Sequence, residues 1–377
     1  MVAISSGGAQ TNPHPSPALR IAVVGPLPPP AGGMANQCQQ LVQLLTSEGI
    51  DVELVRTNSP YRPEWVGSIP LLRAVFRLVP YLTRLWRSAG RVNVMHLLAN
   101  SGWAWHLFAA PAVIVARMRS VPIIVNYRGG GADAFFASAP NHVLKMLAQA
   151  SLCVTPSVFL QRVFTKYGLA STVIPNIIDL TRFVSTAHRV FGNTPHFVVT
   201  RNLEEIYDVA TAIRAFFIIQ ATFPGARLTV AGTGPELTTL QALVCRLNLM
   251  DAVLFSGGIE NVRMPALYAS ADCFLNSSTM DNMPIAILEA FASGVPVVST
   301  NAGGIPDLVT HGVNGLLVPV GDDRAMAREA LRVLAHPALA HDLRQAGLQE
   351  AQKYAWSQVR AKWLHAYRCL ATKRSVV

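Results

Sequence analysis

Short runs of β-branched and aliphatic residues recur along the whole chain, and longer stretches with helical spacing separate them. Strands that alternate with helices form parallel sheets buried on both faces. The pattern therefore predicts an α/β fold with doubly wound, Rossmann-like sheets. The predicted strands are residues 20–25, 52–57, 92–99, 122–128, 152–157 and 171–176, and then 196–202, 227–234, 252–258, 272–278, 295–301 and 315–321.

Twelve strands are too many for one sheet of this type, and a polar segment with Gly and Pro at 183–195 separates two sets of six. We predict an N-terminal, acceptor-side domain over 20–185 and a C-terminal donor domain over 186–355. A terminal amphipathic helix at 356–377 is expected to pack back on the first domain. Open parallel sheets bind ligands at the carboxyl ends of their strands, so two facing sheets would form a cleft.

The composition is typical of a folded globular protein rather than of a disordered chain. Hydrophobic residues make up 51% of the 377 and charged residues 14%. The five cysteines are scattered with no CxxC pair, so neither a zinc site nor a disulfide framework is indicated, and we expect a cytoplasmic protein without a metal. Residues 1–19 are rich in Ser, Gly and Pro and predict a disordered tail without signal-peptide features. The longest apolar run, 103–116, is too short to span a bilayer.

The net charge of +10 is concentrated in the first half of the chain. Seven arginines and a single acid lie in residues 56–91, and within 69–91 the arginines alternate with large apolar residues at near-helical spacing. This pattern is typical of an interfacial helix on an anionic membrane. A solvated Arg-rich face is the alternative. Nucleic acid would also suit the charge, but no nucleic-acid-binding motif accompanies it, so we expect no such partner.

Glycine-rich loops follow several predicted strands. Glycine permits close backbone approach, and free amides at helix starts attract anions, so these loops together indicate a phosphate-bearing ligand. Neither the first loop nor residues 232–237 matches GxGxxG, which argues against a dinucleotide. The loops contain Gly32-Gly33, Gly129–Gly131, Gly232, Gly257-Gly258, 277–279 and 302–306.

Residues 281–292, DNMPIAILEAFA, place one acid before an apolar helix and another inside it. Pro284 suits a first helical turn, and Asp281 or Asn282 could cap it. Glu289 is the sole charge in an element apolar on nearly every face, so it needs a partner. That partner is either an Arg or backbone amides of the protein, or the hydroxyls of a ligand such as a ribose.

The stretch from Asp281 to 309 closely resembles the donor-site signature of family 4 glycosyltransferases, the group 1 retaining enzymes with the GT-B fold. Their hallmark is two acids separated by seven residues, present here as Asp281 and Glu289 with Asp in the first position. The resemblance covers roughly residues 20–370 and is strongest over 170–325. It includes IPNIIDLTRF, LTVAGTGPE and GVNGLLVPVGD.

The resemblance implies transfer of a sugar from a nucleotide-sugar donor, with retention, to a glycan or lipid-linked acceptor, in polysaccharide or glycoconjugate synthesis. Glu289 would bind the ribose, Asp281 the hydroxyls of the transferred sugar, and Arg201 the leaving diphosphate. Gly32 and Gly33 would close over the phosphates. The remaining implied donor contacts are Gly232, Gly257, Gly258 and Ile259, together with Asn282, Met283, Pro284 and Ile285.

Two positions depart from the family pattern. A Lys-Gly pair usually follows the arginine, but Ile206 and Tyr207 stand there. A His commonly follows the fourth strand, where this chain has Arg128, which stays protonated and cannot act as a base. Arg128 therefore either replaces the missing Lys at a phosphate or forms a structural salt bridge.

Two other functions fit the same scaffold. A nucleotide-sugar epimerase would need acid and base groups at the sugar, and the loops offer few candidates. A non-catalytic nucleotide-binding protein would be consistent with the missing Lys.

Overall fold

The computed structural model describes residues 19–29, 32–60, 70–183 and 192–374. The expected disordered tail lies almost wholly outside these ranges, as does most of the polar segment between the two halves. The side chains of residues 70–75 and 373 are also outside the described set.

Two sheets of six parallel strands form the molecule, which confirms the predicted fold class. The first has the order β2-β1-β3-β4-β5-β6 and the second β12-β11-β10-β7-β8-β9. Each predicted strand is present, but most are shorter because the polar residues at their ends belong to loops. The strands are β1 Arg20–Gly25, β2 Asp51–Arg56, β3 Val94–Ala99, β4 Ile123–Tyr127, β5 Leu152–Thr155, β6 Thr172–Val173, β7 His196–Val199, β8 Arg227–Ala231, β9 Val253–Gly257, β10 Cys273–Asn276, β11 Val297–Thr300 and β12 Leu316–Val318.

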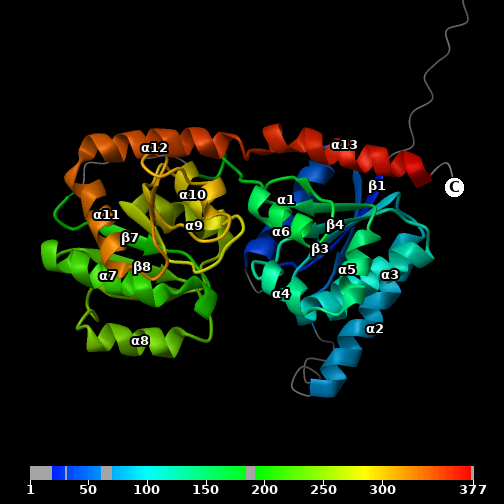
Figure 1. Cartoon of the computed structure of the whole chain (residues 1–377), viewed down its shortest axis with the longest axis horizontal. Helices are drawn as coiled ribbons and strands as arrows, with labels where there is room; N and C mark the ends of the chain where they lie inside the picture. The colour runs from blue at the N-terminus through cyan, green and yellow to red at the C-terminus, as the bar shows by residue number, and fades with distance from the viewer. Residues whose placement is uncertain (1–18, 30–31, 61–69, 184–191, 375–377) are drawn as a thin grey trace, which may run out of the picture.

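Helices cover both faces of each sheet and connect successive strands (Figure 1). Those of the first half are α1 Gly33–Ser47, α2 Pro70–Ala89, α3 Ala110–Met118, α4 Ala132–Ser138, α5 Asn141–Ala148 and α6 Val158–Lys166. Those of the second half are α7 Val209–Thr222, α8 Leu237–Arg246, α9 Met264–Ser270, α10 Ile285–Ala292, α11 Asp323–Ala335 and α12 Pro337–Gln352. Helix α13, Trp356–Arg374, follows α12 and lies over the first sheet (Figure 1).

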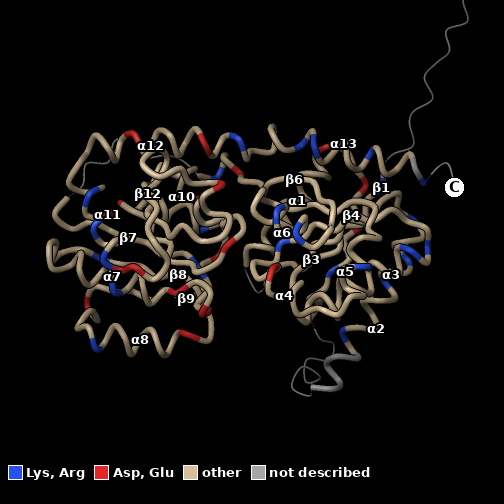
Figure 2. The backbone as a smooth tube through the Cα atoms, in the orientation of Figure 1, with Lys and Arg blue, Asp and Glu red and all other residues tan. Residues whose placement is uncertain are grey.

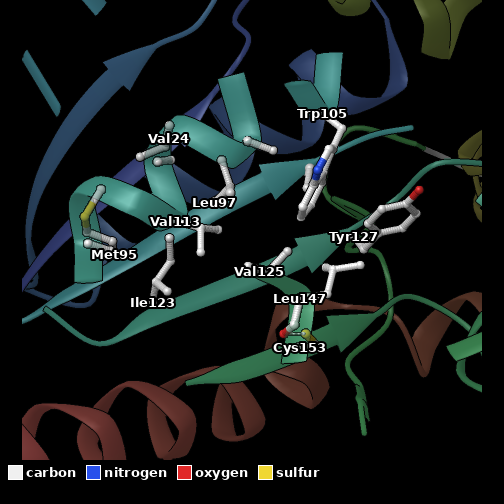
Figure 3. Close-up of a cluster of buried hydrophobic side chains, with 14 of the residues drawn as sticks. Val24, Met95, Leu97, Trp105, Val113, Ile123, Val125, Tyr127, Leu147 and Cys153 are labelled. Carbon is white, nitrogen blue, oxygen red and sulfur yellow. Dashed lines mark hydrogen bonds between the residues drawn. The ribbon is translucent and has the colours of Figure 1, made fainter. Parts of the chain in front are cut away.

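Each sheet has a hydrophobic layer on both faces because its central strands are apolar at nearly every position. On one face of the first sheet, α2 to α6 enclose a cluster that contains Trp105 and Tyr127, and Figure 3 shows these two rings at the same end of it. On the other face, α1 and α13 pack over β1, β3 and β4. Trp363 and Tyr367 of α13 are fully buried there.

A buried polar contact fixes helix α13 on the first sheet. The His96 ring lies on β3, and its Nδ1 is 2.6 Å from the Tyr367 hydroxyl, while Asn126 approaches Nε2 at 3.1 Å. Burial lowers the pKa of His96 to about 3, so this imidazole is neutral at physiological pH. Trp363 stacks on Tyr367 at 5.8 Å between ring centroids.

Charge is uneven between the two halves. Figure 2 shows red and blue positions interspersed over the second domain, whereas blue positions dominate the first. Within the described residues, no helix is long and apolar enough to cross a membrane.

Candidate active site

The two acids of the DNMPIAILEA stretch occupy different environments. Helix α10 begins at Ile285, with Pro284 in extended geometry as its N-cap and no side-chain cap hydrogen bond. The expectation that Asp281 or Asn282 caps this helix is therefore wrong. Each side chain has a stronger partner: Asp281 forms an ion pair, and Asn282 donates to backbone carbonyls of the first domain.

Asp281 pairs with Arg201, which lies just beyond the end of β7. The two side chains are 15% and 11% exposed, so the pair is largely desolvated. The Arg201 guanidinium also donates to Ser278 Oγ at 3.3 Å and lies 4.4 Å from the centre of the Tyr207 ring. Burial lowers the pKa of Arg201, and the nearby Tyr207, Tyr268 and Glu289 oppose that shift.

Polar side chains at the ends of β10 and β11 support this arginine. Ser278 Oγ donates to Asn276 Oδ1 at 3.0 Å, and the Asn276 amide donates to Ser299 Oγ at 2.9 Å. Thr300 Oγ1 donates to the Ser278 carbonyl at 2.6 Å. A connected buried network of this kind holds its members in one geometry.

Glu289 projects from α10 and is partly buried. Its Oε2 accepts a hydrogen bond from the Tyr268 hydroxyl at 3.1 Å. Burial raises the pKa of Glu289 to about 7, although the Tyr268 hydrogen bond and the charges of Arg182 and Arg201 act in the opposite direction. The carboxylate is therefore poised between its two protonation states near neutral pH.

Arg128, at the end of β4, faces the same region from the first domain. Its Nη1 donates to Asn176 Oδ1 at 2.7 Å, and the Asn176 amide donates to the Met283 carbonyl at 2.9 Å. Burial lowers the pKa of Arg128 to about 10, so the group stays charged at neutral pH. Its described partner is an amide rather than a carboxylate.

Asn282 ties the two domains together beside these arginines. Its amide donates to the carbonyl of Gly129 at 2.7 Å and to that of Arg128 at 3.2 Å. On the other side, a Cβ built on Gly130 would lie 3.9 Å from Ile206 Cδ1. The Arg128 loop thus contacts Asn282 directly and lies near Ile206.

Several glycines are required by close backbone approach. A Cβ on Gly232 would lie 1.9 Å from the Arg201 carbonyl oxygen, and one on Gly303 would lie 2.3 Å from that of Asp281. The Gly304 amide donates to the same Asp281 carbonyl at 2.7 Å. Glycine at positions 232 and 303 therefore allows the backbone to pack closely against Arg201 and Asp281.

The other predicted donor contacts lie in loops and at helix starts of the two domains. Gly32 is the N-cap of α1, which begins at Gly33 as expected. Gly257 ends β9 with a φ of +68°, and a Cβ on Gly258 would lie 3.6 Å from Thr233 Cγ2. Ile259 follows and is partly buried, like Ile285, whereas Met283 and Pro284 are buried.

Sequence reasoning missed the partners that orient these groups. Tyr268 precedes Glu289 by 21 positions on a separate helix, and Tyr207 reaches Arg201 from a 3-10 turn over Glu205–Tyr207. Asn176 and Ser278 complete the set. Tyr207 carried a signal as a departure from the family pattern, Ser278 lies in the predicted ligand loop 277–279, and Asn176 lies in the motif IPNIIDLTRF, but none of the three was predicted as a partner of an arginine.

Cavities elsewhere on the surface do not contain these residues. One of about 390 Å³ lies between α3 and α5 and is lined by Val113, Ile114, Arg117, Met118, Met146 and Gln149. Its lining is apolar except for Arg117 and Gln149. The buried arginines and the two acids are far more typical of a site for charged substrates. We therefore place the candidate site at the domain boundary.

Two family models match most of the chain. Residues 183–350 match "Glycosyl transferases group 1", and residues 31–182 match "Glycosyltransferase Family 4". The chain belongs to family 4, group 1, of the glycosyltransferases. This assignment confirms the family resemblance, the GT-B fold and the transferase class.

Curated relatives of this glycosyltransferase are transferases and synthases. N-acetyl-alpha-D-glucosaminyl L-malate synthase of Bacillus anthracis is 38% identical over 35% of this chain and 34% of its own length. A GDP-mannose-dependent alpha-(1-6)-phosphatidylinositol monomannoside mannosyltransferase of Mycobacterium tuberculosis is 27% identical over 82% of this chain and 86% of its own. These relatives give no support to the epimerase hypothesis.

Solved structures show the same fold. Sucrose-phosphate synthase from Thermosynechococcus elongatus has a TM-score of 0.75, with 20% identity over 94% of this chain and all of that one. HepE from Anabaena, in complex with UDP and glucose, has a TM-score of 0.72, with 19% identity over 92% of this glycosyltransferase and 99% of HepE.

Proposed function

We propose that this glycosyltransferase transfers a sugar from a nucleotide-sugar to a hydroxyl of a glycan or lipid-linked acceptor, with retention, in polysaccharide or glycoconjugate synthesis. The observation that carries the proposal is the convergence of Arg201, Asp281 and Glu289 at the carboxyl end of the second sheet. The relatives that use GDP-mannose and the HepE complex with UDP support a nucleotide-sugar donor.

Each group has a role that follows from its chemistry. Glu289 accepts hydrogen bonds from the ribose hydroxyls, because a carboxylate matches a vicinal diol. Asp281 binds hydroxyls of the transferred sugar. Arg201 neutralises the charge that develops on the leaving diphosphate, and stabilising that charge is the main task of the site. The diphosphate in turn accepts the proton of the acceptor hydroxyl.

A Glu289→Gln variant tests this assignment. We expect turnover to fall at least about 100-fold, with unchanged circular dichroism and cooperative unfolding. The donor is identified first by a thermal-shift screen with UDP, GDP, ADP and their sugars, since a ligand that binds only the native state raises stability. A Glu289→Gln variant that turns over substrate as fast as the wild type would contradict the proposed role of Glu289.

We further propose that Arg128 supplies the second cation of the diphosphate site. Ile206 stands where the family has Lys, and it lies near the Arg128 loop, since a Cβ built on Gly130 would be 3.9 Å from Ile206 Cδ1. Two arginines would neutralise a diphosphate without a metal, so we expect activity to persist in excess EDTA.

A charge-rescue experiment tests the role of Arg128. Arg128→Ala should lower kcat/KM, and adding Ile206→Lys to that variant should restore part of the loss. Ile206→Lys alone is the control for a general effect of added charge. Equal losses in the single and the double variant would contradict the proposal.

We also propose that the protein works at the cytoplasmic face of a membrane and binds anionic lipid through 69–91. Helix α2 exposes Phe76, Val79, Leu82 and Trp86. Arg84 and Arg87 are exposed on the same helix. An amphipathic helix with arginines beside large apolar side chains suits an anionic interface.

A further inference from the structure

Four rings gather on the surface of the first domain, beyond the ends of β3 and β4. They are Trp103, His106, Phe135 and His142. Trp103 begins the helical segment after β3, and His106 lies in the π-helical turn Trp105–Ala109 of the same segment. Helices α4 and α5 carry the other two rings. None of them has a role in the donor site described above.

Trp103 is unusual because its side chain is largely in solvent. It is 79% exposed, more than the other exposed large hydrophobic side chains of the described chain. It precedes the buried Trp105, so the turn is anchored by one tryptophan and presents the other. Short π-helical segments occur often at functional sites.

The rings form a connected surface around His106. The centroid of His106 lies 6.2 Å from that of Trp103, 6.1 Å from that of Phe135 and 6.5 Å from that of His142. Both imidazoles are exposed, and Phe135 is partly buried. The surface thus combines an open indole face with ring nitrogens that can donate or accept hydrogen bonds.

This surface adjoins the proposed transfer site. Ser101 lies two positions before Trp103, and its hydroxyl is 2.7 Å from that of Tyr127 on β4. A Cβ on Gly129 would lie 2.3 Å from the same Ser101 oxygen. The residues just before Trp103 therefore pack on the Arg128–Gly129 segment, which itself contacts Asn282 of the donor domain.

We propose that Trp103, His106 and His142 form a subsite for a pyranose ring of the acceptor, with the ring stacked on Trp103 and its hydroxyls hydrogen-bonded to the imidazoles. Pyranoses present C–H groups on one face and hydroxyls at the rim, and this surface offers an aromatic face beside polar edges. The subsite rests on the proposed function, since it assigns the acceptor to the saccharides.

A glycan array probed with the full-length protein tests the subsite without requiring turnover. The wild type should bind one or more immobilised saccharides, and Trp103→Ala should weaken that binding at least about tenfold. Trp103→Phe should retain most of it, because a smaller aromatic face remains. Met250→Ala is the matched control, since Met250 is 68% exposed on the second domain.

Other outcomes overturn the subsite. Absence of any saccharide binding by the wild type does so, as does equal binding by Trp103→Ala. Loss of binding to vesicles of phosphatidylglycerol in Trp103→Ala, with saccharide binding unchanged, identifies the surface as a membrane contact instead.

The proposed function is tested separately by the thermal shift with UDP or GDP, which the Trp103 variants should leave unchanged. If the wild type binds saccharides but no nucleotide, the donor assignment fails while the saccharide site stands. If it binds nucleotide but no saccharide, the reverse holds.

Discussion

At the scale of single residues, the site depends on ionisable groups with few solvent contacts. Arg201 is held by Asp281, Ser278 and the Tyr207 ring, so its position is fixed before any substrate arrives. Such preorganisation reduces the cost of orienting a charge during the reaction. Glu289 is held more loosely, by the hydroxyl of Tyr268.

The raised pKa of Glu289 predicts a pH-dependent stability. Its pKa is about 7 in the folded protein against 4.5 ordinarily, so the native state holds the proton more tightly than the unfolded chain between these values. This residue therefore makes the protein less stable as pH rises through that window. We expect the Tm of Glu289→Gln minus that of the wild type to increase from pH 5 to pH 8 by calorimetry. A difference that falls over this range would contradict the burial of the carboxyl.

Gly232 gives a steric prediction at the same scale. Gly232→Ala places a methyl group against the Arg201 carbonyl, so the backbone of one of the two loops must shift. We expect a loss of about 1–3 kcal/mol in the free energy of unfolding, together with reduced turnover. Urea unfolding measures the loss. Gly131→Ala is the control, because a Cβ there meets nothing within 4 Å.

At the scale of elements, α10 and α2 show what a local pattern does and does not determine. The apolar run predicted helix α10 and a buried Glu289, and in the structure Glu289 is partly buried. The N-cap of the helix is Pro284 and not Asp281 or Asn282 as predicted. Asp281 and Asn282 instead bind residues of other elements, which a local sequence pattern does not predict. For α2 the pattern leaves two outcomes, a membrane-binding face or a solvated one.

Vesicle flotation decides between these two outcomes for α2. Arg84→Glu with Arg87→Glu should abolish binding to phosphatidylglycerol vesicles, because two charges change sign on one exposed face. Arg227→Glu with Arg246→Glu alters two exposed arginines of the second domain by the same charge and should bind as the wild type does. If the wild type does not float with phosphatidylglycerol vesicles, the exposed face of α2 is a solvated one.

At the scale of the whole molecule, the number and parallel direction of the strands were predicted from apolar runs that alternate with helical stretches, whereas their order within each sheet was not predicted. The sequence motif also identified Asp281 and Glu289. Partners such as Tyr268 and Asn176 were not predictable, because they depend on which helices and loops the fold brings together. The contact of Asn282 with Gly129, across the two domains, has the same origin.

The packing of α13 on the first sheet gives a prediction at this scale. Tyr367→Phe removes the hydrogen-bond partner of His96 in the interior, which should cost about 1–3 kcal/mol in the free energy of unfolding. Tyr167→Phe is the matched control, since that hydroxyl bonds Asp133 at the surface, and it should change stability by at most about 0.5 kcal/mol. If the two variants lose the same free energy of unfolding in chemical denaturation, the buried hydrogen bond to His96 does not add stability beyond a surface hydrogen bond.

Helix α13 also bears on how the protein is made. Its residue Tyr367 contacts His96, which is synthesised 271 positions earlier, so one face of the first sheet has α1 but not α13 as cover until α13 is made. Domains generally fold in order as they leave the ribosome. Here the core of the first domain is completed only by α13, so we expect the second domain to be synthesised while part of that core is still uncovered.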